Sequence, residues 1–429
     1  MSKPGSICTT APQVLRADLR SRGGSKAMTL RAVASVVGLV LLSAAAAQGG
    51  TVQVEGGVIV GDAGADGAVT HYLGVPFAAA PVAGLRWRPP QPVAPWQGVL
   101  ETVHAAPSCP QPLPPPGSFY QKEFFLTSER QSEDCLYLNI WTPARAPDEK
   151  LPVMVWFYGG GFVQGSGSLP SFDGEALAHR PVIVVTINYR LGPLGFLALP
   201  ALDQESPDHV SGNYGLLDMI AALRWMQNNV GGFGGDPGNV TIFGQSAGAF
   251  GVNAMMASPL AHGLFRRAIV ESYPMFGISS PTQTLTQAEE GGQKFAASVG
   301  AESLADLRMV ASTDLVRAMD GNAIAFGLRP NVDGHVLPHD LTDVIAAHEA
   351  NGAALMVGSN CTRPRNTAGH RIASLPTSHL LLCMDSQTRH PEQRFTPPIF
   401  FLTGVYLPRP ARRLSAPRQP TPARGFLFR

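Results

Sequence analysis

Apolar and polar residues along this chain alternate between two patterns, one typical of strands and the other of helices. Period-two alternation predicts an opening hairpin at 52–54 and 58–60 and a further strand at 133–140. Short apolar runs predict buried strands at 151–158, 182–189, 240–243, 264–272 and 353–357. Helical patterns follow at 214–230, 249–256, 288–299 and 305–319. This order predicts an α/β fold, with a mostly parallel central sheet and helices on both faces.

Composition limits the classes of partner. The chain has 429 residues, 45% of them apolar, which is enough for one large or two medium domains. The formal net charge is only +1, so neither nucleic acid nor an anionic membrane surface is an expected partner. The 46 glycines and 38 prolines indicate many loops between the apolar segments.

The amino terminus has the pattern of an export signal. Residues 28–47 begin with a positive charge, continue as an apolar run at 32–42, and end in small residues at 45–47 that suit cleavage. Residues 1–27 then form an upstream extension, and Met28 is the alternative start. The competing interpretation is a membrane anchor, but the apolar run is shorter than the ~20 residues that a spanning helix needs. We therefore expect a secreted or periplasmic protein.

Two cysteines, Cys109 and Cys135, lie at either end of a Pro-rich loop. In an oxidising compartment such a pair forms a disulfide more readily than it persists as two free thiols. Export therefore favours the bridge, with two free thiols as the alternative.

A candidate nucleophile lies between a predicted strand and a predicted helix. Residues 244–248 read Gly-Gln-Ser-Ala-Gly, directly after the strand at 240–243 and before the helix at 249–256. In a G-x-S-x-G nucleophile elbow, glycines on both sides let strand and helix approach closely while the serine is exposed at the turn. The alternative is a chance match in a glycine-rich chain, but the strand-turn-helix context favours Ser246 as a nucleophile.

Three consecutive glycines, Gly159 to Gly161, end the predicted strand at 151–158. Backbone amides without side chains can approach a ligand closely, as is needed where an ester carbonyl becomes an oxyanion. The alternative is a flexible or phosphate-binding loop. No G-x-x-x-x-G-K-[ST] motif is present, which disfavours phosphate.

On these motifs the chain resembles the type B carboxylesterases, a family that includes carboxylesterases, cholinesterases and some fungal lipases. The match runs from about 56 to 360 and rests on the stretches 133–140, 158–162, 188–196, 213–218 and 233–248. The resemblance implies an α/β-hydrolase fold, a small-molecule ester substrate and no cofactor. It also implies the roles of five residues: Ser246 as nucleophile, Gly160, Gly161 and Ala247 as oxyanion-hole donors, and Cys109 bonded to Cys135.

Two departures from the family pattern concern the substrate. The family often has Glu immediately before the nucleophile, where this chain has Gln245. Choline-binding members carry a tryptophan in the first disulfide loop; here the aromatic residues of that loop are Phe119, Tyr120, Phe124 and Phe125. A weaker cation–π surface disfavours choline esters. We expect neutral short-chain or aryl esters instead.

The resemblance stops after Asn360. The family places its triad acid three residues further on, but residues 361–365 contain no carboxylate, so neither the triad acid nor the base is identified. Residues 361–429 are rich in Arg and Pro and have no lysine. We therefore expect a domain at 48–360 without its final strands and helices, followed by a divergent, disordered tail. A frameshift near codon 361 explains this change, and a lineage-specific carboxyl-terminal domain is the alternative.

Histidines of the divergent tail are candidates for the base. His370 and His379 are the candidates, and surface positions are the alternative for each. His335 and His339 are separated by Pro338, which disfavours a helical metal pair, so no metal site is expected. The sequence thus predicts a serine ester hydrolase. The alternatives are an inactive binding protein on the esterase scaffold and a non-functional fragment. The oligomeric state stays open.

Overall fold

The computed structural model describes residues 50–118, 121–122, 130–272, 282–347, 350–361 and 380–385. By compactness the chain divides into residues 1–387 and 388–429, and only the first unit contains described residues. The predicted signal peptide, the four aromatic residues of the disulfide loop, and His370 and His379 all lie outside the described residues.

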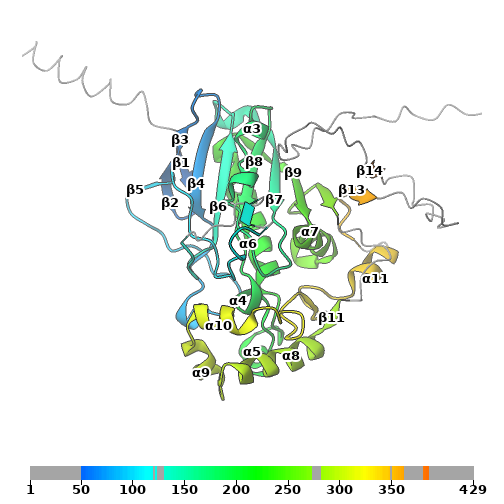
Figure 1. Ribbon diagram of the computed structural model, residues 1–429. Coiled ribbons are helices and arrows are strands. Elements are labelled where there is room, and N and C mark those ends of the chain that lie inside the picture. The colour runs from blue at the N-terminus through cyan, green and yellow to red at the C-terminus, as the bar shows by residue number, and fades with distance from the viewer. Residues whose placement is uncertain are drawn as a thin grey trace, which may run out of the picture. The chain divides into compact units, whose positions relative to one another are not determined.

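Within the described residues, one large sheet organises the fold (Figure 1). In spatial order its strands are β14 (Leu380–Asp385), β13 (Ala354–Cys361), β10 (Arg267–Glu271), β9 (Gly235–Gln245), β7 (Leu151–Phe157), β8 (Ile183–Ile187), β6 (Tyr137–Thr142), β4 (Thr70–Pro76) and β3 (Asp62–Ala63). From β14 to β8 neighbouring strands are parallel, and β6, β4 and β3 continue antiparallel. The predicted α/β fold with a mostly parallel sheet is confirmed.

Two smaller sheets accompany it. The predicted opening hairpin is confirmed as the antiparallel pair β1 (Thr51–Val54) and β2 (Gly57–Val60), which β5 (Val99–Glu101) extends. The short strands β11 (Gln283–Thr284) and β12 (Asn331–Val332) pair with each other.

The helices connect the parallel strands. They are α3 (Glu175–Ala178), α4 (Gly192–Phe196), α5 (Pro200–Glu205), α6 (Tyr214–Asn229), α7 (Ala247–Ala257), α8 (Leu285–Ser298), α9 (Leu304–Met309), α10 (Ser312–Met319) and α11 (Leu341–Ala346). Figure 1 shows α8, α9 and α10 gathered beside α4 and α5, below the sheet.

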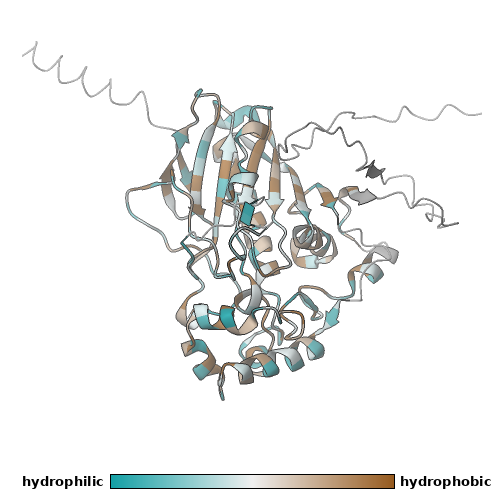
Figure 2. Cartoon of the chain, in the orientation of Figure 1, coloured by the Kyte–Doolittle hydropathy of each residue, from teal (hydrophilic) through white to brown (hydrophobic). Residues whose placement is uncertain are grey.

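Strand β8 shows why both faces of the sheet are covered. All five of its residues are buried, and its four apolar residues divide between two clusters of apolar side chains. Val185 belongs to the large cluster that includes side chains of α6 and α7, whereas Val184 packs with Trp141 and Ala178 of α3. Figure 2 shows the resulting brown, apolar strands at the centre of the sheet. A strand buried on both faces favours a nearly continuous apolar run, and the one polar residue of β8, Thr186, donates to the carbonyl of Gly167 (2.7 Å).

Two sequence-based boundaries were wrong in part. The strand predicted at 133–140 begins only at Tyr137, and Glu133, which precedes it, forms an ion pair with the guanidinium of Arg86. The helix predicted at 305–319 is two helices, with a break at Val310 and Ala311, both in extended conformations. Arg86 donates to the carbonyls of Arg308 (3.0 Å) and Val310 (2.8 Å) at this break. One buried guanidinium therefore satisfies carbonyls that a continuous helix would have bonded internally.

The tail also contains structure that the sequence did not predict. Strand β14 lies within the region 361–429 and pairs in parallel with β13, with Met356 opposite Leu380 and Cys361 opposite Asp385. The sequence signal for this strand is the short apolar run at 380–383, too brief to be distinguished from its surroundings.

Candidate active site

Ser246 occupies a strained turn between β9 and α7. Its backbone has φ 55° and ψ −120°, far from the helical values of the residues that follow. A Cβ added at Gly244 would lie 2.7 Å from the carbonyl carbon of Gly248, and one at Gly248 would lie 2.0 Å from the carbonyl oxygen of Phe157. Only glycine fits at both positions. The strand-turn-helix geometry predicted from the G-x-S-x-G motif is therefore present.

The triple-glycine loop packs directly against this turn. A Cβ added at Gly159 would lie 3.2 Å from the Cβ of Ser246 and 2.7 Å from the carbonyl oxygen of Gln245. Gly160 and Gly161 then take positive φ values of 117° and 68°, which glycine adopts without strain. The loop closes as a turn in which the Gly160 carbonyl accepts from the amides of Val163 (3.1 Å) and Gln164 (3.2 Å).

The structure thus brings together the four residues predicted to act on an ester carbonyl. Ser246 is half-buried at the amino-terminal end of α7, and Ala247 is the first residue of that helix. The amides of Gly160, Gly161 and Ala247 donate no hydrogen bond to another residue in the described part of the chain. Unpaired amides near a helix amino terminus favour negative charge. The arrangement can therefore stabilise an oxyanion formed at the serine.

A reciprocal pair of tyrosines fixes the ends of β7 and β8 beneath the loop. The Tyr158 hydroxyl donates to the carbonyl of Tyr189 (3.1 Å), and the Tyr189 hydroxyl donates to the carbonyl of Tyr158 (2.6 Å). Their rings stack with centroids 4.2 Å apart. Burial raises the pKa of both hydroxyls well above the ordinary range, so both remain donors. The strand end that carries Gly159 is held from both sides.

The elbow is also tied to the neighbouring strand. The amide of Ser246 donates to the carbonyl of Glu271 (3.0 Å), the last residue of β10. Glu271 lies in register with Gln245, and burial raises the pKa of its carboxyl group. The sequence reasoning did not single out Glu271. The available signal was one acidic residue at the end of an otherwise apolar run.

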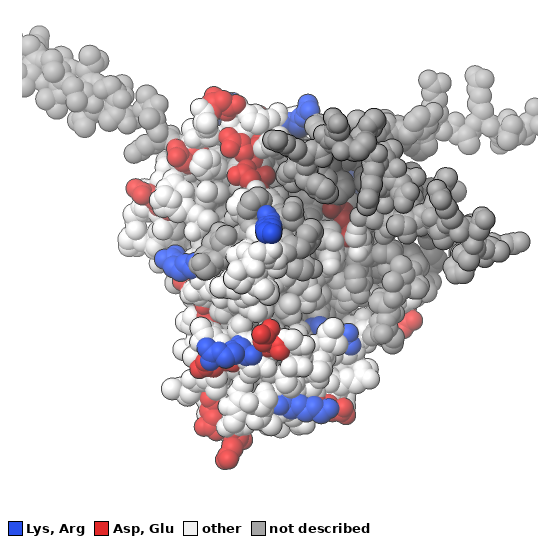
Figure 3. Space-filling view, viewed as in Figure 1, with Lys and Arg blue, Asp and Glu red and all other residues white. Residues whose placement is uncertain are grey.

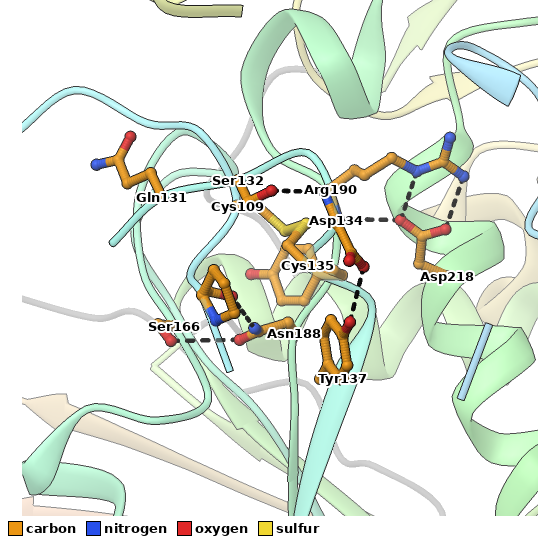
Figure 4. The surroundings of a disulfide bond; sticks show 12 residues. Cys109, Gln131, Ser132, Asp134, Cys135, Tyr137, Ser166, Asn188, Arg190 and Asp218 are labelled. Atoms are coloured by element: carbon orange, nitrogen blue, oxygen red, sulfur yellow. Dashed lines mark hydrogen bonds and ion pairs between the residues drawn. A yellow bond between two sulfur atoms is a disulfide. The ribbon is translucent and has the colours of Figure 1, made fainter. Parts of the chain in front are cut away.

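The predicted disulfide between Cys109 and Cys135 is formed (Figure 4). Both cysteines are buried, and Cys135 lies two residues before β6. Figure 4 shows Ser166 and Asn188 close to this bridge, joined to each other by a hydrogen bond of 3.3 Å. The disulfide loop therefore adjoins the segment that follows the triple glycine.

The triad acid and base are not located among these residues. Strand β13 ends at Cys361. Residues 362–365, where the family pattern would place the triad acid, lie outside the described residues, as do His370 and His379. One group of metal-ligating type occurs in the described part, formed by Asp66, Glu175 and His179. It lies at the β3–β4 turn and at α3, where His179 Nε2 is 3.7 Å from Asp66 Oδ2.

Comparison with known proteins agrees with this geometry. The model of the carboxylesterase family matches residues 48–367. The chain belongs to the carboxylesterase family. It is 44% identical to fumonisin B1 esterase of Sphingopyxis macrogoltabida over 305 residues, which are 70% of this chain and 54% of the relative. It is 41% identical to para-nitrobenzyl esterase of Bacillus subtilis (strain 168) over 301 residues, or 68% of this chain and 58% of the relative.

Solved structures support the same fold. A thermophilic PNB esterase superimposes with a TM-score of 0.64 at 37% identity, covering 74% of this carboxylesterase-family chain and 66% of the other. The fold class predicted from the resemblance, an α/β-hydrolase, is thereby confirmed. The chain spans only a little over half the length of the two curated relatives described above. None of the helices in the described part has the length and apolarity that a membrane crossing requires.

Proposed function

We propose that this chain is a serine hydrolase of carboxylic esters that acts through an acyl-enzyme on Ser246. The observation that carries the proposal is the contact between elbow and loop, where a Cβ at Gly159 would lie 3.2 Å from the Cβ of Ser246. That contact places a strained serine beside amides with no other described partner. Membership of the carboxylesterase family supports the same chemistry.

The reaction follows from these positions. The Ser246 hydroxyl oxygen attacks the ester carbonyl carbon, and the amides of Gly160, Gly161 and Ala247 stabilise the negative charge that develops on the carbonyl oxygen. The bond to the alcohol then breaks, and the serine proton passes through a general base to the departing alkoxide. Water attacks the acyl-enzyme in the same way and releases the acid. Neither this base nor the acid that orients it is identified among the described residues.

The proposed substrates are neutral esters with short acyl chains or aryl groups. One relative is named for para-nitrobenzyl esters and another for fumonisin B1, and both names support a carboxylic ester as the substrate. The disulfide loop contains no tryptophan, which disfavours choline esters.

Labelling with a fluorophosphonate tests the proposal. The reagent forms a covalent bond with an activated serine, so the wild-type chain should label stoichiometrically and Ser246→Ala should not. Ser272→Ala is a matched control at another serine with positive φ, and it should leave the labelling of Ser246 intact. A wild-type sample that melts cooperatively yet does not label would favour the binding-protein alternative. Aggregation without labelling would favour the fragment.

We also propose that the chain is exported, to the periplasm or the medium, after cleavage following Ala47. The apolar run at 32–42, the small residues that follow it, and a disulfide between buried cysteines support export. Mass spectrometry of the mature protein from the native host tests this. An amino terminus at Gln48 is expected, and a retained Met1 or Met28 would contradict it.

A further inference from the structure

We infer that Gln111 is a positioning residue for the oxyanion loop and that the Cys109–Cys135 disulfide holds it in place. The inference rests on the proposed function, because its consequence for activity concerns the acylation of Ser246. It assigns a role in catalysis to a side chain that has no contact with the reacting atoms. Four observations, from the amide of Gln111 back to the disulfide, carry it.

The side chain of Gln111 pairs with the backbone of one residue, Gly165, in the segment that follows the triple glycine. Its Oε1 accepts from the amide of Gly165 (2.6 Å), and its Nε2 donates to the carbonyl of Gly165 (2.8 Å). Nε2 also donates to the carbonyl of Cys109 (3.0 Å). Only 3% of Gln111 is exposed, so water does not compete for these bonds. A side-chain amide is a neutral group that can accept from the N–H and donate to the C=O of the same residue.

Gly165 in turn sets the position of the triple glycine. A Cβ at Gly165 would lie 2.4 Å from the ring of Tyr158, so its backbone lies against the end of β7. The preceding carbonyl, that of Gln164, comes within 2.0 Å of where a Cβ of Gly160 would be. Neither glycine has room for a side chain, so the backbone around Gly165 is packed directly against Tyr158 and Gly160. A displacement of Gly165 therefore displaces the turn that carries the Gly160 amide.

The disulfide fixes Gln111 from the other side. Gln111 is two residues from Cys109, and its own amide donates to Oε1 of Gln131 (3.1 Å), a residue near Cys135. Ser108 binds both neighbours of Gln131, accepting from the amide of Ser132 (3.0 Å) and donating to the carbonyl of Arg130 (3.1 Å). Figure 4 shows Gln131 and Ser132 beside the bridge. The two ends of the loop thus hold Gln111 between them.

A second set of hydrogen bonds, made by Asn188, attaches the disulfide loop to the segment after the triple glycine. Loss of the Gln111 bonds should therefore affect catalysis more than folding. Asn188 Oδ1 accepts from the amide of Gly167 (2.9 Å), and its Nδ2 donates to the carbonyl of Pro107 (3.2 Å). The disulfide loop therefore stays attached when the Gln111 bonds are lost. What is lost is the restraint nearest to the oxyanion amides, where a displacement of ~1 Å can cost ~100-fold in rate.

The experiment compares Gln111→Leu with Gln91→Leu. Gln91 is exposed, and within the described residues its side chain bonds only to the nearby carbonyl of Pro89. We expect Gln111→Leu to slow the fluorophosphonate acylation of Ser246 by about 10- to 100-fold. With p-nitrophenyl butyrate the loss should lie in kcat, with KM within about threefold of wild type. Gln91→Leu should match the wild type. Acylation of Gln111→Leu within about twofold of wild type would overturn the inference.

Gln111→Glu gives a readout that a merely structural role would not move. A neutral carboxyl group can accept from the Gly165 amide and donate to its carbonyl, whereas an ionised carboxylate can only accept. The acylation rate of Gln111→Glu relative to wild type should therefore recover as the pH is lowered from about 8 to about 5. A ratio independent of pH would contradict the assigned pair of bonds.

The disulfide is tested by Cys109→Ala/Cys135→Ala. This variant should slow acylation, and adding Gln111→Leu to it should slow acylation by less than the product of the separate effects, because both act on one restraint. Hydrogen exchange of the peptide 158–167 is measured in parallel and needs no activity. Faster exchange in Gln111→Leu than in Gln91→Leu supports the inference, whether or not wild-type Ser246 labels. Failure of wild-type Ser246 to label would count against the proposed function alone. Equal exchange overturns it.

Discussion

Two of the three buried clusters of apolar side chains in the described part of the chain differ in the polar groups that surround them. The sheet cluster, built on the central strands with α6 and α7, adjoins buried polar residues, several of which make more than one hydrogen bond. Asn139, for example, accepts from the amide of Gly74 (3.0 Å) and donates to Thr186 Oγ1 (3.0 Å). The second cluster joins α4, α5 and the start of α6 to α8, α9 and α10.

In this helical layer the ion pairs lie toward solvent. Arg308 and Arg88 both bind Glu205, at 2.7 Å and 3.1 Å, and Arg317 binds Asp314 with both side chains exposed. Figure 3 shows acidic and basic side chains close together in the lower part of the view, where this layer lies. Exposed pairs contribute about 0–1 kcal/mol each, whereas a buried group left without its partner costs several kcal/mol. The candidate site is built on the cluster in which substitutions are least tolerated.

Gly248→Ala should break the sheet cluster most severely. The new Cβ would lie 2.0 Å from the carbonyl oxygen of Phe157, a backbone atom that cannot rotate away. We expect a loss of at least ~3 kcal/mol in the free energy of unfolding, and loss of Ser246 labelling. Urea unfolding followed by tryptophan fluorescence measures the first effect. Gly231→Ala is the matched control, since no atom lies within 4 Å of its added Cβ.

A smaller Gly248→Ala effect, comparable with that of Gly231→Ala, would mean that helix α7 can shift away from β7. The strained turn at Ser246 would then not depend on close contact between strand and helix.

The second prediction contrasts a buried ion pair with an exposed one. The Asp218 carboxylate, fully buried, accepts from Arg190 Nε (2.8 Å), Nη2 (2.7 Å) and the Arg190 amide (2.9 Å) (Figure 4). Asp218→Asn leaves the buried guanidinium without its counter-charge, so we expect a loss of ~3–5 kcal/mol in unfolding free energy. Asp314→Asn removes the same charge from the exposed pair with Arg317 and should cost less than ~1 kcal/mol.

Equal losses in these two variants would show that the burial contrast between the clusters has no energetic consequence. Both measurements use the same urea unfolding, at the same pH near 7.

The same contrast explains which features the sequence could predict. The elbow was predictable because its geometry restricts the residue types: Gly244 and Gly248 have no room for a side chain, and Ser246 requires a positive φ. The parallel strands were predictable because burial on both faces requires continuous apolar runs. The disulfide was predicted from two cysteines in a chain with an export pattern, and it is present.

Features that depend on contacts between distant residues were missed. The break between α9 and α10 is stabilised by Arg86, more than two hundred residues away in the sequence, and helical periodicity does not detect it. The bonds of Gln111 to Gly165 are invisible for the same reason, since a lone glutamine in a Pro-rich loop has no distinctive pattern. Triad residues outside the motifs pose the same problem, because one acid and one histidine need no particular neighbours.

The smallest expected effect tests the helical layer through pH. Partial burial, then a hydrogen bond to Asp203 and the negative charge of that residue, raise the pKa of Glu289 from 4.5 to about 7. A raised pKa means that the folded state holds the proton more tightly. Below pH 4.5 the carboxyl is neutral in both states, so its contribution to stability is intact there, and it is lost as the pH rises toward 7.

Glu289→Gln removes this titration, so the variant should gain in Tm relative to wild type between pH 4.5 and about 7, and keep that gain above it. Glu290→Gln makes the same charge change at the exposed neighbour and is the control. Thermal melts at closely spaced pH values measure the difference. If both variants follow the wild type at every pH, the acidic pair is solvated like the other surface charges of the layer. A gain in Tm confined to Glu289→Gln would identify one position in the helical layer where a charged group destabilises the fold, as an unpaired charge does in the sheet cluster.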